Sequence, residues 1–372
     1  MPVVPPRIPV AAPVLGEEEL ANVVEAVRSG WISSLGAFIA RFETEFAAFC
    51  GASHAVAVSN GTAAMHLALA AAGIGPGDEV LVPTLTFVAT ANAVRYTGAT
   101  PVFVDAESAT WQMDPRDLAA RVTSRARAIV PVHLYGHPCD MEPILATAKR
   151  HGLAVIEDAA EAHGARCRGR RVGALGDVGC FSFYGNKIIT TGEGGMCVTN
   201  DAALADRLRL LRDHGMDPKR PYWHELIGFN YRMTNLQAAI GVAQMTRIEG
   251  FITKKRELAR WYAEALAPLA AAGRLTLHPE AAWAESVFWM NSVLLADVRA
   301  SVDEVRARLL DRGIDSRPFF HPSHTLPPYA AGERRPIAEA LAARGLNLPS
   351  GVGLTRDDVV RVAAALIDAL EP

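Results

Sequence analysis

Short apolar runs alternate with amphipathic segments between residues 55 and 157, and this alternation constrains the fold more than any other feature. The apolar runs occupy residues 55–58, 80–83, 101–104, 128–132 and 153–157. Helical patterns lie between them, from a turn at residues 59–63 to residue 72, and at residues 86–96, 114–121 and 141–151. Apolar strands separated by amphipathic helices predict an α/β fold with a mostly parallel sheet covered on both faces.

Two domains are expected, because a chain of 372 residues is too long for one small core. Before the alternating region, helical patterns cover residues 17–28 and 37–49. After it, a long helix is predicted over residues 247–272, a strand over 287–295, further helices over 302–312 and 357–370, and a proline-rich loop over 316–325. We therefore assign residues 1–245 to an N-terminal segment and the large α/β domain, and residues 246–372 to a small α+β domain.

Lys187 is the most unusual single residue of the sequence. It follows an aromatic run that ends at Tyr184 and precedes the apolar Ile188. Burial without a partner destabilises an ammonium group, so its pKa falls and the amine becomes a usable nucleophile. One use of such an amine is a Schiff base with a carbonyl, including that of pyridoxal phosphate. The alternative is a loop lysine that merely follows a strand.

Two further motifs fall at the carboxyl ends of predicted strands, where such sheets bind ligands. The turn with Gly61 and Thr62 leads into a helix whose free N–H groups and positive dipole attract a phosphate. Asp158 directly follows an apolar strand, where a protonated pyridine nitrogen suits a buried carboxylate. A helix N-cap without a ligand and a structural salt bridge are the respective alternatives. A phosphate site, an aspartate and a lysine in this order together match the needs of pyridoxal phosphate.

Over nearly its whole length the chain resembles the DegT-type, pyridoxal-phosphate-dependent nucleotide-sugar aminotransferases. The most specific motifs are SNGTAA at residues 59–64, PTLTFVAT at 83–90, EDAAEAHGA at 157–165, SFYGNK at 182–187 and GFNYRMTNLQAA at 228–239. The resemblance implies an aspartate-aminotransferase-like fold of type I and a homodimer with shared active sites. The chain is most similar to the subgroup that transfers an amino group from L-glutamate to C4 of GDP-4-keto-6-deoxymannose, which yields GDP-perosamine.

The resemblance also implies a role for each matching residue. Lys187 would hold pyridoxal 5′-phosphate as a Schiff base and later shuttle a proton. Asp158 would face the pyridine nitrogen, and Phe87 would stack on the cofactor ring. The phosphate would be held by four residues of this chain, Gly61, Thr62, Ala63 and Ser182. Asn230 of the partner subunit would reach the same phosphate.

Glu161 departs from much of the family, in which a glutamine stands near the cofactor's 3-oxygen. Two negative oxygens in contact repel each other, so we expect Glu161 to be protonated, or bridged by a donor, beside the bound cofactor. Members of the subgroup that makes GDP-perosamine also carry this glutamate, which favours that subgroup.

Four residues are further candidates for substrate contact. Trp31 lies in a glycine-bounded loop, residues 30–36, which is either a lid or a simple surface connection. Arg232 follows the implied phosphate residue and would bind a phosphate or carboxylate, or form a structural ion pair. His321 and His324 lie in the proline-rich loop, where substrate contact and loop packing are both expected. No metal site is expected at His133, because glycine and proline interrupt any helix that would align neighbouring ligands with it.

Composition excludes several kinds of partner. The net charge is −3 and 21% of the residues are charged, with neither a basic stripe for nucleic acid nor a polybasic patch for a membrane. No run of about 18 apolar residues predicts a membrane span, and the proline-broken residues 1–13 do not match a signal peptide. Five scattered cysteines without a C-x-x-C pair predict free thiols in a reducing cytoplasm.

Three other functions stay open at the level of sequence. An aminotransferase that acts at C3 of a keto-sugar would share every motif above. A pyridoxamine-dependent sugar dehydratase of the same fold would replace the lysine with histidine, so Lys187 argues against it. A non-enzymatic regulatory protein would need an added DNA-binding module, for which the sequence has no spare segment.

Overall fold

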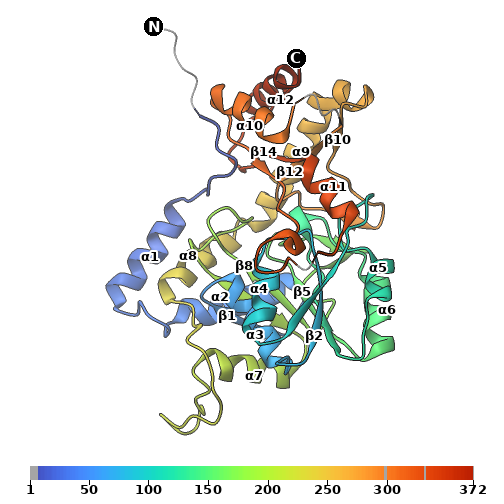
Figure 1. Cartoon of the computed structure of the whole chain (residues 1–372). Helices are drawn as coiled ribbons and strands as arrows, with labels where there is room; N and C mark the ends of the chain where they lie inside the picture. Colours follow the sequence, from blue (N-terminus) through green and yellow to red (C-terminus); the bar gives the residue numbers. More distant parts are fainter. Residues whose placement is uncertain (1–6, 297–299, 331, 372) are drawn as a thin grey trace.

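A seven-stranded sheet forms the centre of the large domain in the computed structural model, which describes residues 7–296, 300–330 and 332–371 (Figure 1). The strand order is β1-β9-β8-β5-β4-β2-β3. β9 is antiparallel to both neighbours, and the other adjacent pairs are parallel. The strands are β1 His54–Val58, β2 Glu79–Pro83, β3 Thr100–Val104, β4 Ala126–Ile129, β5 Ala154–Asp158, β8 Val178–Ser182 and β9 Gly195–Thr199. The predicted mostly parallel sheet is confirmed.

Helices cover both faces of this sheet because successive side chains of a strand point to opposite sides. In β1, Ala55 and Ala57 pack into the core under α2 and α8, whereas Val56 and Val58 pack under α3 and α7. The helices of this domain are α1 Glu17–Ser29, α2 Ala37–Cys50, α3 Gly61–Ala71, α4 Ala89–Tyr96, α5 Pro115–Ala120, α6 Met141–His151, α7 Ala202–Arg212 and α8 Asn235–Met245.

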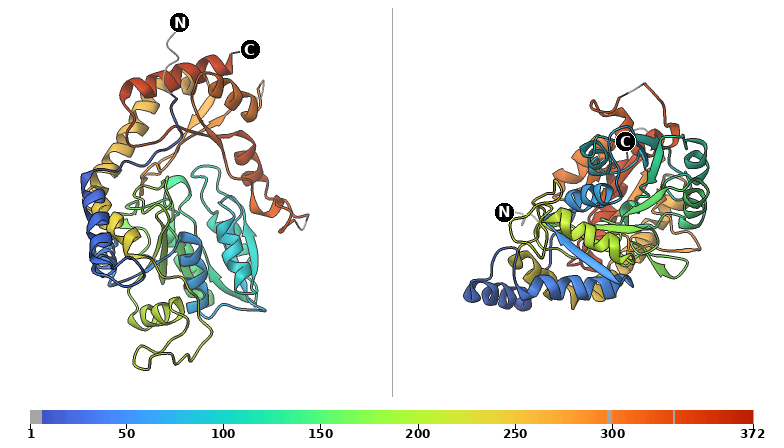
Figure 2. Two further views of the ribbon diagram at one scale, coloured as in Figure 1. Left: turned by 90° about the vertical axis from the view of Figure 1, so that its left-hand side faces the viewer. Right: turned by 90° about the horizontal axis from the view of Figure 1, so that it is seen from below.

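The small domain sits over one end of the large domain, as the two views of Figure 2 and the orange-to-red segments of Figure 1 show. Its antiparallel sheet has the order β10-β12-β14-β13. Its elements are α9 Ile248–Ala271, β10 Leu275–Leu277, β12 Asn291–Leu295, α10 Val302–Asp311, β13 Arg317–Pro318, α11 Pro336–Arg344, β14 Gly345–Leu348 and α12 Arg356–Leu370. A separate ribbon joins β11 Ala284–Glu285, β6 Arg166–Cys167 and β7 Arg170–Arg171.

The N-terminal segment reaches the small domain, although we assigned it with the large one. The Ile8 amide donates to the Gly313 carbonyl at 2.8 Å, and the Ser350 amide donates to the Val10 carbonyl at 2.7 Å. The predicted domain boundary, between residues 245 and 246, falls between α8 and α9. The division into these two units stays a prediction.

Three predicted elements differ from the structure by two or more residues at one end or both. The strand predicted at residues 128–132 ends at residue 129, because Pro131 has no N–H for the ladder. The helix predicted from residue 86 begins at Ala89. The strand predicted from residue 287 begins at Asn291, because Phe288 has a left-handed backbone with φ of +45° that interrupts an extended run.

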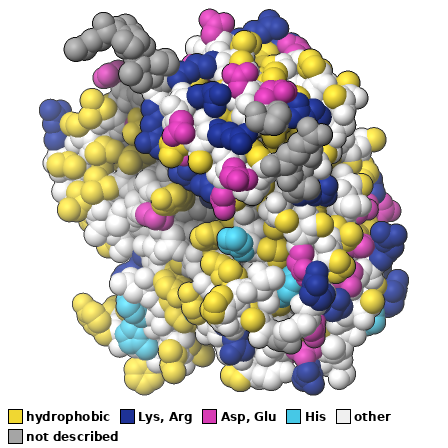
Figure 3. Space-filling view, turned by 45° about the horizontal axis from the view of Figure 1, so that its top comes forward, with side chains coloured by type: hydrophobic (Ala, Val, Ile, Leu, Met, Phe, Trp, Pro, Cys, Tyr) yellow, Lys and Arg dark blue, Asp and Glu magenta, His cyan; other side chains and the backbone are white. Residues whose placement is uncertain are grey.

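The surface carries charges of both signs. On the face shown in Figure 3, Lys and Arg side chains are interspersed with Asp and Glu over the upper part of the molecule. Among the residues that the structure describes, no helix combines the length and the apolar character needed to cross a membrane. Hydrophobic side chains gather at the left-hand edge of Figure 3, the side on which α1 lies in Figure 1.

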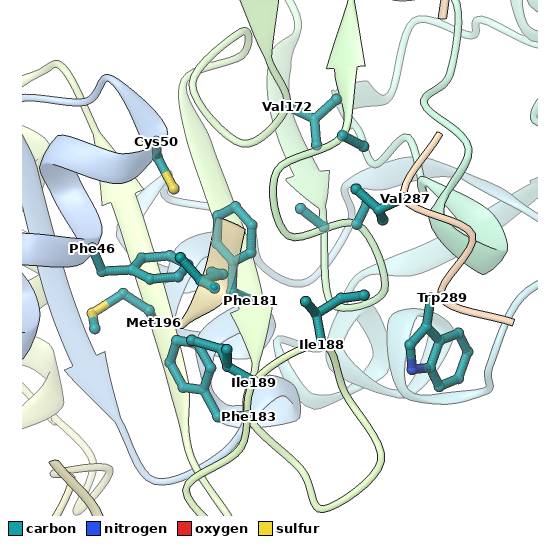
Figure 4. Close-up of a cluster of buried hydrophobic side chains, with 14 of the residues drawn as sticks. Phe46, Cys50, Val172, Phe181, Phe183, Ile188, Ile189, Met196, Val287 and Trp289 are labelled. Carbon is teal, nitrogen blue, oxygen red and sulfur yellow. The ribbon is translucent and has the colours of Figure 1, made fainter. Parts of the chain in front are cut away.

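A cluster of aromatic side chains joins α2 to the strand that precedes Lys187 (Figure 4). Phe46 is fully buried, and its ring lies 4.9 Å from that of Phe181 and 5.2 Å from that of Phe183. These distances and near-perpendicular rings are typical of favourable edge-to-face pairs. The cluster therefore packs α2 against the strand and the residues that lead to Lys187.

Phe46→Ala is expected to lower the free energy of unfolding by about 3–5 kcal/mol, because it removes buried area and leaves a cavity among the surrounding rings. Urea unfolding at one fixed protein concentration measures the change. Val360→Ala, at an exposed site on α12, is the matched control and is expected to change stability by less than about 0.5 kcal/mol. Equal effects of the two substitutions would contradict the supporting role of the cluster.

Candidate active site

Eight of the predicted site residues line one cavity of about 630 Å³ at the carboxyl ends of the parallel strands. The small domain also contributes to its lining through Trp289 and Phe320. The eight residues are Gly61, Thr62, Ala63, Phe87, Asp158, Glu161, Ser182 and Lys187. Tertiary structure thus brings together residues that span more than 120 positions of the sequence.

The N-terminus of α3 forms one end of the cavity. The Asn60 side chain caps the helix by accepting from the Ala63 N–H at 2.8 Å. The first N–H groups of the helix, those of Gly61 and Thr62, have no intrahelical acceptor. A Cβ on Gly61 would lie 2.6 Å from the Ser182 Cβ, so only glycine lets the helix start pack against this serine. Two amides, a hydroxyl and a helix dipole make a site for a phosphate.

Asp158, at the end of β5, is oriented by two donors. Its Oδ2 accepts a hydrogen bond from Thr90 Oγ1 at 2.7 Å, and its Oδ1 accepts from the Ala160 amide at 3.2 Å. A carboxylate held in this way faces the cavity in a fixed direction and suits a cationic N–H donor. Sequence analysis missed Thr90, although this hydroxyl lies only three residues after Phe87 in the same motif.

Lys187 lies between an acidic and an aromatic group. Its Nζ is 3.6 Å from Glu161 Oε1 and 4.0 Å from the centre of the Trp289 ring. Burial lowers the pKa of Lys187 from its ordinary value, while the charges of Glu161 and Asp158 oppose the shift. The amine is therefore easier to deprotonate than a surface lysine, as a nucleophile requires.

Glu161 is buried next to this lysine. Burial raises the pKa of the carboxyl group to about 7, and the charge of Asp158 adds to the rise. Lys187 and the Tyr135 amide, which donates to Glu161 Oε2 at 2.8 Å, act in the opposite direction. Glu161 can consequently hold a proton near neutral pH, and its protonation beside the bound cofactor stays a prediction.

Glu157 supports the site from behind. This buried carboxylate accepts hydrogen bonds from His133 Nε2 at 3.0 Å, from the Gly173 amide at 2.8 Å, and from two further amides. Burial raises the pKa of Glu157, but the His133 ring and the amides together lower it by more. The net shift of this pKa is therefore downward. Sequence analysis did not identify this anchor, because its partners are distant in the chain.

Phe87 is the exposed wall of the cavity. Its ring is 55% exposed and lies 5.6 Å from the ring of Phe320, which comes from the loop after β13. The exposed face is available to stack on a planar ligand. A neighbouring cavity of about 760 Å³ shares both rings and is also lined by His321.

The other predicted site residues lie outside the 630 Å³ cavity of this chain. Asn230 accepts a hydrogen bond from Arg232, and Arg232 forms an ion pair of 3.0 Å with Asp213. Trp31 is exposed on the loop after α1. His324 is buried and joins Thr84, at 2.6 Å, to Glu339, at 3.2 Å. Their proposed contacts with substrate or phosphate stay predictions.

Comparison with known proteins identifies the family to which the chain belongs. The sequence profile of the DegT/DnrJ/EryC1/StrS aminotransferase family matches residues 13–367. A GDP-perosamine synthase from Caulobacter vibrioides is 54% identical over 98% of this chain and 99% of its own. One from Escherichia coli O157:H7 is 47% identical over 96% and 97% of the two chains. The chain therefore belongs to the DegT/DnrJ/EryC1/StrS aminotransferase family.

A solved structure supports the same assignment. DesV from S. venezuelae, determined in complex with a ketimine intermediate, matches with a TM-score of 0.90 and 39% identity over 99% of this chain and 100% of that chain. The predicted family, the fold of type I and the class of enzyme, an aminotransferase that depends on pyridoxal phosphate, are confirmed.

The residues of the cavity fit this cofactor. The start of α3 offers the Gly61 and Thr62 amides to a phosphate. Gly195 lets β9 pack closely against this turn, since a Cβ there would lie 2.4 Å from the Asn60 carbonyl oxygen. Asp158 supplies an acceptor for a pyridinium N–H, and Lys187 supplies the amine. These are the donor and acceptor types that a phosphate, a pyridine nitrogen and an aldehyde require.

Glu161→Gln is expected to change the pH dependence of stability of the cofactor-free protein. The folded protein binds more protons than the unfolded chain between the ordinary carboxyl pKa of 4.5 and about 7, so this group makes stability fall as pH rises through that window. Glutamine stays neutral, so across this window the wild type should lose about 3 kcal/mol of unfolding free energy relative to the variant.

Urea unfolding at a series of pH values between 4.5 and 8 measures this difference. Glu193→Gln, at an exposed glutamate that lines the same cavity, is the control and should follow the wild type within about 0.5 kcal/mol. If the unfolding free energies of the wild type and Glu161→Gln depended on pH in the same way, Glu161 would have an ordinary carboxyl pKa, which would contradict the prediction.

Proposed function

We propose that this protein transfers an amino group from L-glutamate to C4 of GDP-4-keto-6-deoxymannose and so forms GDP-perosamine. The observation that carries the proposal is the 54% identity to a GDP-perosamine synthase over 98% of the chain. A third relative of that name, from Vibrio cholerae, is 43% identical over 95% of the chain and supports the same substrate. Glu161, which stands where many family members have glutamine, adds support for this subgroup.

Lys187 is the proposed catalytic residue. When bound, pyridoxal 5′-phosphate withdraws electrons from the carbon that bears the amino group. Lys187 Nζ would hold the cofactor covalently, and its free amine would accept a proton from the reacting carbon and return it. Its lowered pKa raises the share of neutral amine that is able to accept this proton.

Two neighbouring carboxyl groups would control further protons of the site. Asp158 would accept from a protonated pyridine nitrogen, and Thr90 fixes the direction of that carboxylate through the 2.7 Å hydrogen bond. Glu161 lies 3.6 Å from Lys187 Nζ and, because its pKa is raised to about 7, would exchange a proton with that amine and with a bound cofactor. Phe87 would stack on the cofactor ring, and the start of α3 would hold its phosphate.

Both substrates meet the same Lys187 amine in this scheme. L-Glutamate delivers its amino group and leaves as 2-oxoglutarate before the keto-sugar enters. Ping-pong kinetics are therefore expected. The five cysteines, all buried and unpaired among the described residues, support our proposal that the enzyme works in the reducing cytoplasm.

Product analysis tests the substrate and the carbon that is aminated. The purified protein, L-glutamate and GDP-4-keto-6-deoxymannose are expected to give GDP-perosamine, identified by mass and by NMR assignment of the amino group to C4. Lys187→Ala should lower turnover at least about 10³-fold, because it removes both the nucleophile and the proton carrier. Amination at C3, exclusive use of a dTDP- or UDP-linked keto-sugar, or turnover by Lys187→Ala would each overturn the proposal.

A homodimer with shared active sites is the second part of the proposal. The segment between α7 and α8 projects from the molecule (Figures 1 and 2) and exposes large apolar side chains, with Tyr222 90% and Ile227 93% exposed. Leu20 and Trp31 on and after α1 are exposed as well. Apolar surface of this kind marks an interface, and a second copy would place Asn230 of the partner subunit near the phosphate.

Ile227→Asp is expected to weaken the dimer at least about 100-fold, because it buries an unpaired carboxylate in the interface. Sedimentation velocity over a range of protein concentrations measures the change, and activity should fall in parallel with the dimer fraction. Val360→Asp, at an exposed site on α12, is the control and should leave the dimer intact. A wild-type protein that is monomeric at every concentration would contradict the proposal.

A further inference from the structure

Lys255 is a second buried lysine, and the proposed reaction does not use it. It lies on α9 with 2% of its surface exposed. Its Nζ donates to the Trp289 carbonyl at 2.8 Å and to the Ser350 carbonyl at 2.6 Å. Burial lowers the pKa of Lys255 to about 7. An ammonium kept in the interior at this cost has a structural or functional reason.

One of the two carbonyls belongs to the residue that covers Lys187. The Trp289 ring lies 4.0 Å from Lys187 Nζ, and its indole N–H donates to the Asn186 carbonyl at 2.8 Å. Trp289 is thus held at both ends, by Lys255 at its backbone and by Asn186 at its ring. In Figure 4 it lies at the edge of the buried cluster, beside Ile188.

The backbone around Trp289 is under strain. Phe288 has φ of +45°, which is unfavourable for an aromatic residue. The segment lies directly on Gly136, where an added Cβ would be 2.6 Å from the Trp289 nitrogen, and the Val287 amide donates to the Gly136 carbonyl at 3.0 Å. Such a conformation persists only where surrounding contacts determine it, and Lys255 supplies one of them.

The second carbonyl connects Lys255 to the N-terminal segment. Ser350 follows β14, and its amide donates to the Val10 carbonyl at 2.7 Å. Lys187 and Lys255 also line the same small cavity of about 10 Å³. Lys255 therefore joins α9, the Trp289 segment and the end of β14 directly behind the active-site lysine.

We propose that Lys255 is a positioning residue for Lys187: it holds the Trp289 backbone so that the indole face lies against the Lys187 amine. The inference rests on the role of Lys187 proposed above. The face of an indole attracts a cation, so a fixed Trp289 favours the protonated form of the Lys187 nitrogen and sets the direction in which it points. Lys255 itself touches neither substrate nor cofactor.

Lysine suits this role because its ammonium has three donors on a flexible stem. Methionine fills a similar volume but leaves the carbonyls of Trp289 and Ser350 without donors. Lys255→Met should therefore free the Trp289 segment, and the indole should lose its contact with Lys187. The protonated form of the Lys187 nitrogen then loses its stabilisation.

The experiment follows the protonation of Lys187 in the full-length protein. In the cofactor-free form, the rate at which trinitrobenzenesulfonate modifies Lys187 is measured by peptide mass spectrometry as a function of pH. In the holoenzyme, the visible absorbance of the bound cofactor is titrated with pH. Lys255→Met is expected to lower both midpoints by about 0.5–1 pH unit, the size of a partly desolvated cation–π contact.

A double-mutant cycle separates positioning from a general structural effect. Trp289→Leu should lower the midpoints by a similar amount, and adding Lys255→Met to it should produce less than about 0.2 unit of further change, because the contact is already lost. Lys254→Met is the matched control. This neighbouring lysine pairs with Glu257 at 2.9 Å and lies over Trp261 instead, so its loss should leave both midpoints unchanged.

Unshifted midpoints in Lys255→Met, or a shift that persists undiminished in the Trp289→Leu background, would overturn the proposal. Should Lys255→Met fail to fold, Lys255→Gln, whose amide still donates to a carbonyl, carries the same test with a smaller shift in the same direction. The modification assay does not require turnover. A failure of the proposed reaction would appear instead as a Lys187→Ala protein that remains active.

Discussion

Burial of the Lys187 ammonium at the carboxyl edge of the sheet is the constraint on which the surrounding structure depends. A cation removed from water requires compensation, and here Glu161 at 3.6 Å and the Trp289 ring at 4.0 Å provide it. The compensation is incomplete, because the pKa of the lysine is lowered and that of Glu161 is raised to about 7. Incomplete compensation is what leaves an exchangeable proton in a catalytic site.

The two domains contribute different parts of this environment. Asp158 ends strand β5 of the large domain, whereas Glu161 and Lys187 lie in the turns that follow β5 and β8. The small domain supplies Trp289 and Phe320, which come from irregular segments and lie over the same cavity. Rigid strands and the turns that follow them fix the reacting groups, whereas the segments that cover them depend on contacts such as those of Lys255.

Much of the fold and site could be predicted from the sequence. Apolar runs of strand length predicted the parallel sheet. The motifs around Gly61, Asp158 and Lys187 lie at its carboxyl edge, where residues of different strands converge. Irregular structure was harder to predict from the sequence. Trp289 was expected inside a strand, but the left-handed Phe288 precedes it, and this conformation depends on packing against Gly136, 152 residues away in the chain.

The sequence by itself determined the class of fold and the chemical groups of the site, because strand and helix periodicity and side-chain type are local properties. Only the tertiary structure decided how those groups affect one another. Thr90 on Asp158, His133 on Glu157, and Lys255 on Trp289 are pairs that only folding brings into contact, and their partners are separated by 24 to 68 positions. Charge, burial and direction at Lys187 follow from such contacts, because electrostatic and hydrogen-bond energies depend on distance in space and not on distance along the chain.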